Sequence, residues 1–187
     1  RGARQVGIEG FGHNIRNLRE RDLTGKEGGH GDFAPLDALE DRILVELRRS
    51  FRRVSVERIL SGRGLMNLYE ALASLEGQPA IIHDEKDLWT AAMDGSDSLA
   101  AAALDRFCLT LGAVAGDLAL AQGASAVAIG GGLGLRLAEH LPRSGFRTRF
   151  IAKGRFERRM DALPVKLITH PQPGLFGAAA AFAREHG

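Results

Sequence analysis

The chain has 187 residues with 44% hydrophobic and 26% charged content, which is typical of an ordinary globular protein that can bury one core. The basic excess behind its pI near 9.0 lies in residues 1–26 and the remainder is close to neutral, so a nucleic-acid partner is not expected. The one cysteine, Cys108, excludes an internal disulfide and favours a reducing compartment such as the cytoplasm, with its thiol buried in a helix. No apolar run approaches the roughly 20 residues of a membrane span, so no membrane partner is expected.

The N-terminal 26 residues carry several glycines and little hydrophobic periodicity. They are therefore predicted to be irregular, with one short helix near 15–21. A polar, glycine-bearing loop follows at 27–35. From there to residue 122, apolar residues at helical spacing, together with capping residues, predict four helices. Their approximate ranges are 36–53, 65–75, 84–93 and 97–122, the last capped by Ser96.

The most informative stretch begins at Ser125. An apolar run to Ile129 predicts a buried strand, and Leu133, Leu137 and Leu141 then recur at the spacing of one helix face. The glycines between strand and helix let the backbone approach a phosphate or ribose, although a turn that binds nothing has the same pattern. A second strand is predicted at 164–169 and a last helix at 175–184. With no internal repeat, these elements indicate one α/β unit.

Two polar groups lie in the first half of the chain. Glu27, His30 and Asp32 surround a glycine pair, where carboxylates and an imidazole can hold sugar hydroxyls. A solvated turn is the alternative interpretation, and metal binding is disfavoured because no second histidine or cysteine lies at ligand spacing. Glu57 lies among apolar residues and needs a partner if it is partly buried; an ion pair with Arg58 or with another arginine would make its role structural.

Taken in order, several motifs from Glu27 to the end of the chain resemble those of bacterial ATP-dependent glucokinases. The resemblance implies the actin-like, hexokinase-type fold of two lobes that close over sugar and ATP. It further implies that residues 27–187 form the C-terminal lobe, a ribonuclease H-like α/β unit with a mixed sheet and flanking helices. The motifs occupy 27–35, 54–65, 128–132, 144–146, 153–156, 164–165 and 173–177.

The same resemblance implies ligands for particular residues. The cofactors would be ATP and Mg²⁺, the substrate glucose, and a homodimer is common in the family. The segment 173–180 would lie at the hinge between the lobes. The residues implied are Glu27, His30 and Glu57 for glucose, and Gly130, Gly131, Gly132 and Gly174 for ATP.

The sequence also departs from the family pattern. It contains neither an Asp-Ile-Gly-Gly-Thr phosphate loop nor an aspartate in an Asn-Asp-Phe context, and residues 1–26 lack the Gly-Thr-Gly turn expected before Glu27. No residue here is therefore assigned as the catalytic base, which is expected in an N-terminal lobe, and the chain alone is expected to be inactive.

Two functions compete on the sequence alone. The first is phosphorylation of glucose to glucose 6-phosphate by a glucokinase of which this chain is a fragment. The second is a non-catalytic module that binds sugar or nucleotide, as a remnant or a regulator. A Rossmann-type dehydrogenase ranks third, because residues 130–134 lack the full glycine fingerprint and a following acidic ribose ligand.

Overall fold

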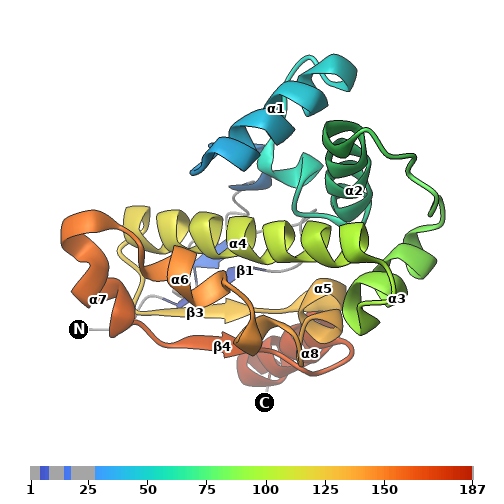
Figure 1. The fold of residues 1–187 in the computed structure, drawn as a ribbon. Coiled ribbons are helices and arrows are strands. Elements are labelled where there is room, and N and C mark those ends of the chain that lie inside the picture. Colours follow the sequence, from blue (N-terminus) through green and yellow to red (C-terminus); the bar gives the residue numbers. More distant parts are fainter. Residues whose placement is uncertain (1–4, 9–14, 18–27, 187) are drawn as a thin grey trace.

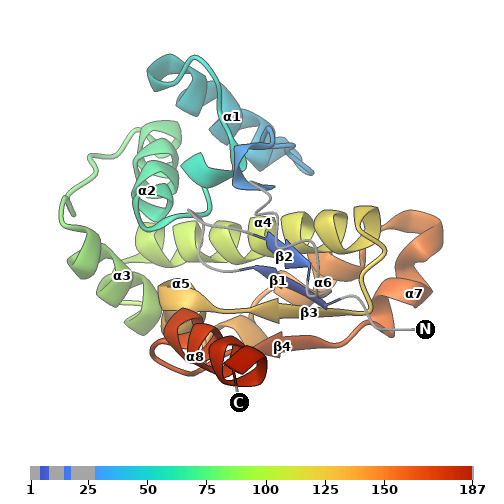
Figure 2. The ribbon, with the colours of Figure 1, turned by 180° about the vertical axis from the view of Figure 1, so that it is seen from behind.

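The computed structural model describes residues 5–8, 15–17 and 28–186. In Figure 1 the long helix α4 (Ser98–Ala121) crosses the middle of the molecule. Helices α1 (Ala38–Ser50) and α2 (Gly62–Glu76) lie on one side of it and the sheet lies on the other. Figure 2 shows the same arrangement from behind, with the final helix α8 (Pro173–His186) beyond the sheet.

The sheet has four strands in the order β2-β1-β3-β4. Strand β1 (Gln5–Ile8) pairs with β2 (Ile15–Asn17) in antiparallel and with β3 (Ala126–Ile129) in parallel orientation, and β4 (Val165–Leu167) runs parallel to β3. The sheet is therefore mixed, and the strands predicted near 125–129 and 164–169 are confirmed.

The prediction for the N-terminal segment is wrong where the structure describes it. Gln5–Ile8 and Ile15–Asn17 are strands, not irregular chain or the start of a helix. They belong to the same sheet as β3, so this segment is not separate from the rest of the fold. Strand β1 pairs in parallel with β3, more than a hundred residues away, and the local glycine content gives no sign of that partner.

The helices agree closely with the sequence signals. Asp84 caps α3 (Glu85–Asp94), accepting from the amides of Lys86 and Asp87, and Gly95 closes this helix at φ 73°. The cap of α4 is Asp97 rather than Ser96, because its carboxylate accepts the Ala100 amide at 2.7 Å. The shorter helices are α5 (Gly131–Arg136), α6 (Phe146–Ile151) and α7 (Glu157–Asp161), so α5 ends before Leu137 and Leu141.

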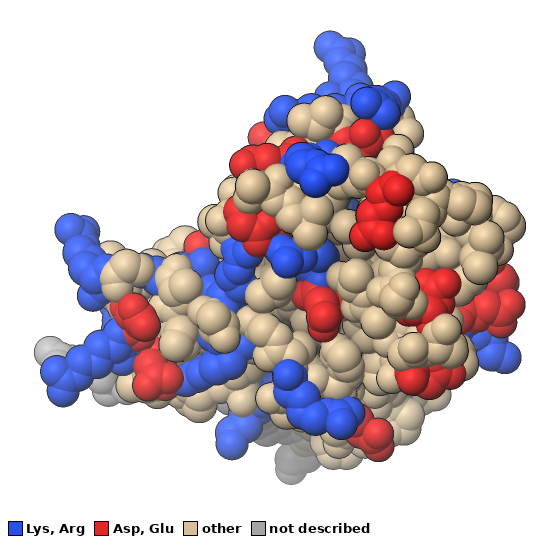
Figure 3. Space-filling view, viewed as in Figure 1, with Lys and Arg blue, Asp and Glu red and all other residues tan. Residues whose placement is uncertain are grey.

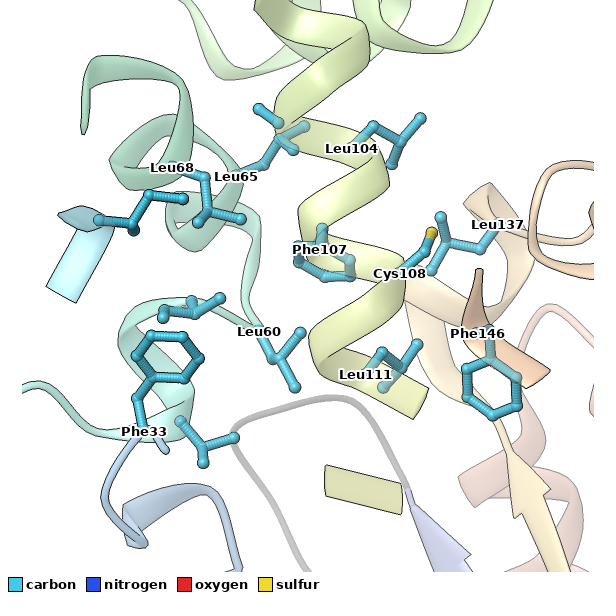
Figure 4. Packing of buried hydrophobic residues seen from close by; sticks show 14 of the residues in the cluster. Phe33, Leu60, Leu65, Leu68, Leu104, Phe107, Cys108, Leu111, Leu137 and Phe146 are labelled. Atoms are coloured by element: carbon cyan, nitrogen blue, oxygen red, sulfur yellow. The ribbon is translucent and has the colours of Figure 1, made fainter. Parts of the chain in front are cut away.

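Helix α4 forms the centre of the hydrophobic core. Figure 4 shows Leu65 and Leu68 of α2 on one side of it, and Leu137 and Phe146 on the other. Cys108 is fully buried between them, as predicted, and burial raises the pKa of its thiol to about 12. The thiol therefore stays protonated at neutral pH and is a poor nucleophile.

Helix α4 is also long and apolar enough to cross a membrane by length and composition, so the expectation that no run approaches this length is wrong. Most of its apolar stretch is buried inside the fold, where it packs against α2, α3 and α6. This is the position of a core helix, and core helices pass the same test of length and composition.

Helices α4 and α6 approach each other through glycines. A Cβ on Gly112 would lie 2.1 Å from the carbonyl oxygen of Phe146, and one on Gly116 would lie 2.5 Å from that of Phe150. Lys153, just beyond α6, completes the contact: its Nζ lies 2.7 Å from Asp117 Oδ1 and donates to the carbonyl of Ala113. The two backbones can be this close only because residues 112 and 116 have no side chain.

Four charged side chains join α1 to α4 and α6. Asp37 Oδ2 accepts from Arg106 and Arg149, both at 2.6 Å, while its Oδ1 caps α1. Glu40 has a side chain only 3% exposed and lies 3.2 Å from Arg149. Burial alone would raise the pKa of Asp37, but the Glu40 amide and the two guanidinium groups outweigh it and hold that pKa below its usual value. This charged network fixes the base of the loop that precedes α1.

Candidate functional site

The loop that carries the predicted sugar ligands begins with a short 3₁₀ turn, Gly28–His30. It is fastened to residues 54–56, because the Phe33 amide donates to the Val54 carbonyl at 3.0 Å and the Val56 amide donates to Gly31 at 2.8 Å. The Phe33 ring is buried in the core beneath. A second 3₁₀ turn, Val56–Arg58, follows at once, so two polar loops far apart in sequence lie side by side.

This pairing brings together two of the three predicted sugar ligands. His30 Nδ1 lies 3.7 Å from Glu57 Oε2, with side chains 61% and 39% exposed, so both are open to a ligand. The third, Glu27, lies outside the described residues. The guanidinium of Arg58, the arginine next to Glu57 in the sequence, lies over the Phe51 ring at 4.4 Å from its centroid.

Sequence reasoning missed Arg53. Its side chain donates from Nε to Asp32 Oδ1 and from Nη2 to the His30 carbonyl, each at 2.5 Å. Asp32 is therefore paired with this arginine, although its side chain is also largely exposed. No pattern in the sequence indicates the contact, because its partners are 21 and 23 residues away from Arg53.

The predicted adenosine turn lies at the end of β3. Gly130 has an extended backbone, and Gly131 has φ 80°, a left-handed conformation that favours glycine. A Cβ on Gly132 would meet nothing within 4 Å, so the chain is open here. Gly174, in the first turn of α8, is open in the same way, and Figures 1 and 2 both place α8 next to α5.

A chain of contacts connects the two candidate regions. The start of α2, five residues after Glu57, packs against α3, since a Cβ on Gly62 would collide with the Glu85 carboxylate. Glu85 in turn lies 3.5 Å from Arg136 at the end of α5, and that guanidinium covers the Trp89 ring. The polar loops and the glycine turn are thus tied through α2, α3 and α5.

The charges around these elements are mixed in sign. Figure 3 shows basic side chains at the left of the view, over α6 and α7, and acidic ones at the right, over α3. Within the described ranges, no three or more histidines, cysteines, aspartates or glutamates are grouped so that they could hold a metal ion. The described site therefore consists of one His–Glu pair, an arginine clamp and an open glycine turn.

Comparison with known proteins identifies the family of this chain. The model of a family described as glucokinase matches residues 8–185. The chain belongs to the glucokinase family. The glucokinase of Zymomonas mobilis subsp. mobilis is 63% identical over 177 residues, which cover 95% of this chain and 55% of that protein. The match begins at residue 8, so most of the segment that sequence analysis had left outside the glucokinase resemblance belongs to it.

Solved glucokinase structures share the fold. A glucokinase from an Antarctic psychrotroph superposes with a TM-score of 0.82 at 34% identity, over 96% of this chain and 57% of that one. A ROK family glucokinase from Streptomyces griseus, solved with glucose and AMPPNP, gives 0.61 at 20% identity over 97% and 61%. The chain thus spans little more than half the length of these glucokinases.

Proposed function

We propose that this chain is the glucose- and adenosine-binding part of an ATP-dependent glucokinase that acts in the cytoplasm. In this proposal it forms the ribonuclease H-like, actin-like C-terminal lobe of a two-lobed enzyme. The reaction moves the γ-phosphoryl group of ATP to the 6-hydroxyl of glucose. The hydroxyl loses its proton to a base, and ADP is released as the leaving group. The observation that carries the proposal is the exposed His30–Glu57 pair, held between two loops in a glucokinase-family chain.

The sugar site is built from hydrogen-bonding groups rather than from apolar walls. The Glu57 carboxylate can accept from two hydroxyl groups, and the His30 ring lies beside it. Because both side chains come from short turns fastened to each other, their spacing is set before the sugar binds. The Streptomyces griseus glucokinase was solved with glucose and AMPPNP, which supports glucose and ATP as the molecules bound here.

Replacing Glu57 by glutamine tests the sugar site. Loss of a charged hydrogen-bond partner typically costs about 1.5–3 kcal/mol, so we expect glucose to bind about tenfold more weakly or worse. ATP affinity should stay near that of the parent chain. Isothermal titration calorimetry on the 187-residue chain measures both. Glu70→Gln is the matched control, because Glu70 is exposed and lies in the middle of α2. An equal loss for both ligands would assign Glu57 a structural role.

Gly132 is the sharper probe of the nucleotide site. Gly131→Leu would strain the backbone whatever binds there, because Gly131 has φ 80°, whereas the space beside Gly132 is open. We therefore expect Gly132→Leu to keep the fold and glucose binding, and to weaken an ATP analogue at least about tenfold by occupying its place. Fluorescence titration with a labelled analogue measures this. Undiminished analogue binding by the folded variant would refute the adenosine assignment.

The described residues fit ATP better than they fit its metal. The open backbone at Gly132 can accept a nucleotide, while the described residues include no group of three or more histidines, cysteines, aspartates or glutamates that could hold a metal ion. When bound, Mg²⁺ would neutralise phosphate charge. No described residue is assigned as the base for the attacking hydroxyl. The chain is therefore proposed to bind without ordinary turnover, and a coupled assay separates this from a complete kinase.

A further inference from the structure

The turn that carries His30 has little of its own to keep it in one conformation. Gly28, Gly29 and Gly31 leave three of its four residues without a side chain, and glycine loses more backbone freedom on folding than any other residue. The side chains of His30 and Asp32 are 61% and 74% exposed, so burial does not hold them. The order of this turn must come from specific contacts.

The guanidinium of Arg53 supplies two of these contacts at once. Its Nε donates to Asp32 Oδ1 and its Nη2 to the His30 carbonyl, so one rigid group grips the chain on both sides of Gly31. A planar guanidinium fixes the separation of its two acceptors, which a lysine ammonium cannot do.

Arg53 directly precedes the residues whose backbone hydrogen bonds join this turn to the second loop. The next residue, Val54, accepts the Phe33 amide through its carbonyl, and Val56 donates to Gly31. The arginine fork lies beside these two bonds and fixes the one peptide, between residues 30 and 31, from which the His30 ring projects toward Glu57.

We propose that Arg53 is a positioning residue for the sugar site. It holds the His30 peptide so that the ring stays beside Glu57, and Asp32 is its counter-ion rather than a sugar ligand. Arg53 itself touches no substrate. The effect on glucose rests on the proposed function, whereas the effect on the turn can be measured without any ligand.

The test compares Arg53→Met with Arg52→Met in the 187-residue chain. Both arginines are exposed, but only Arg53 grips the turn. We expect Arg53→Met to speed hydrogen exchange at the Gly31 and Val56 amides and to shift the NMR signals of the His30 ring. Glucose should bind about fivefold more weakly, and the effect is no larger because the Arg53–Asp32 pair is exposed to solvent. ATP affinity and the melting temperature should stay unchanged. Arg53→Lys, which keeps the charge but not the fork, should be intermediate, and Arg52→Met should resemble the parent.

Two results would overturn the proposal. One is unchanged exchange and unchanged His30 signals in Arg53→Met, because the turn would then be ordered without the clamp. The other is an equal loss of glucose and ATP binding with a lowered melting temperature, because Arg53 would then support the whole fold. If the parent chain binds no glucose, the proposed sugar site fails on its own, and amide exchange still decides whether Arg53 holds the turn.

Discussion

Replacing Gly112 by alanine is expected to destabilise the chain by about 3 kcal/mol, a large share of the roughly 5–15 kcal/mol that stabilises a typical domain. The added methyl group would lie 2.1 Å from the carbonyl oxygen of Phe146, and a backbone atom cannot rotate away as a side chain can. Helices α4 and α6 would have to separate, and this would open the core around Cys108 and Phe146. Urea unfolding followed by circular dichroism measures the loss.

The matched control is Gly177→Ala in α8. A Cβ at Gly177 would meet nothing within 4 Å, so this change adds helix propensity without a collision. We expect it to leave stability unchanged or to raise it by about 0.5–1 kcal/mol. If Gly112→Ala unfolded at the same urea concentration as the parent, the close approach of α4 and α6 would be incorrect.

Replacing Arg149 by methionine is expected to cost about 3 kcal/mol of stability. The Glu40 carboxylate, only 3% exposed, would keep the Leu36 amide as a donor, but its nearest cation would be Arg106 at 3.8 Å. A charge left buried without its partner is costly, whereas an exposed arginine contributes little. Arg159→Met, on the exposed surface of α7, is the control and should change stability by less than about 0.5 kcal/mol. Equal unfolding midpoints for the two variants would contradict this role of the network.

The Arg149→Met variant should also change how the free energy of unfolding falls at acidic pH. Because the pKa of Asp37 is lowered from 3.8 in the folded state, its ionised form contributes stability above that value, and this contribution is lost as the pH falls below it. Without Arg149, one cause of the lowered pKa is removed. We therefore expect a smaller loss of stability below about pH 4 in Arg149→Met than in the parent, measured by urea unfolding across this range.

Much of the helical framework was predictable because its signals are local. Asp84, Gly77 and Gly95 lie next to the elements they begin or end, so each boundary is written in a few residues. Strand β1 was not predictable in this way, since its parallel partner β3 lies far along the chain, and β2, near to β1 in sequence, joins the sheet only through β1. Local pattern alone left the N-terminal segment irregular.

The residues of the candidate site also differ in how far the sequence could predict them. The resemblance to glucokinases indicated His30 and Glu57, and the structure brings them together. The resemblance gave no sign of Arg53, whose partners are fixed by the way two loops lie against each other. The residue pattern around the glycine pair also suggested Asp32 as a group that could hold sugar hydroxyls, and in the structure Asp32 is paired with that arginine. Residue type indicated the chemistry, and only the fold showed which of these groups lie close to one another.

Two exposed surfaces, the outer strand β4 and the helix α8, determine how copies of this chain would meet in concentrated solution. The outer strand β4 has three residues with Lys166 exposed at its centre, a poor template for another strand to join. Residues 174–183 of α8 are exposed along their length and include Leu175 and Phe176. Of these two surfaces, α8 is therefore the one at which contacts between copies would be favoured, and β4 is disfavoured as a site for strand pairing.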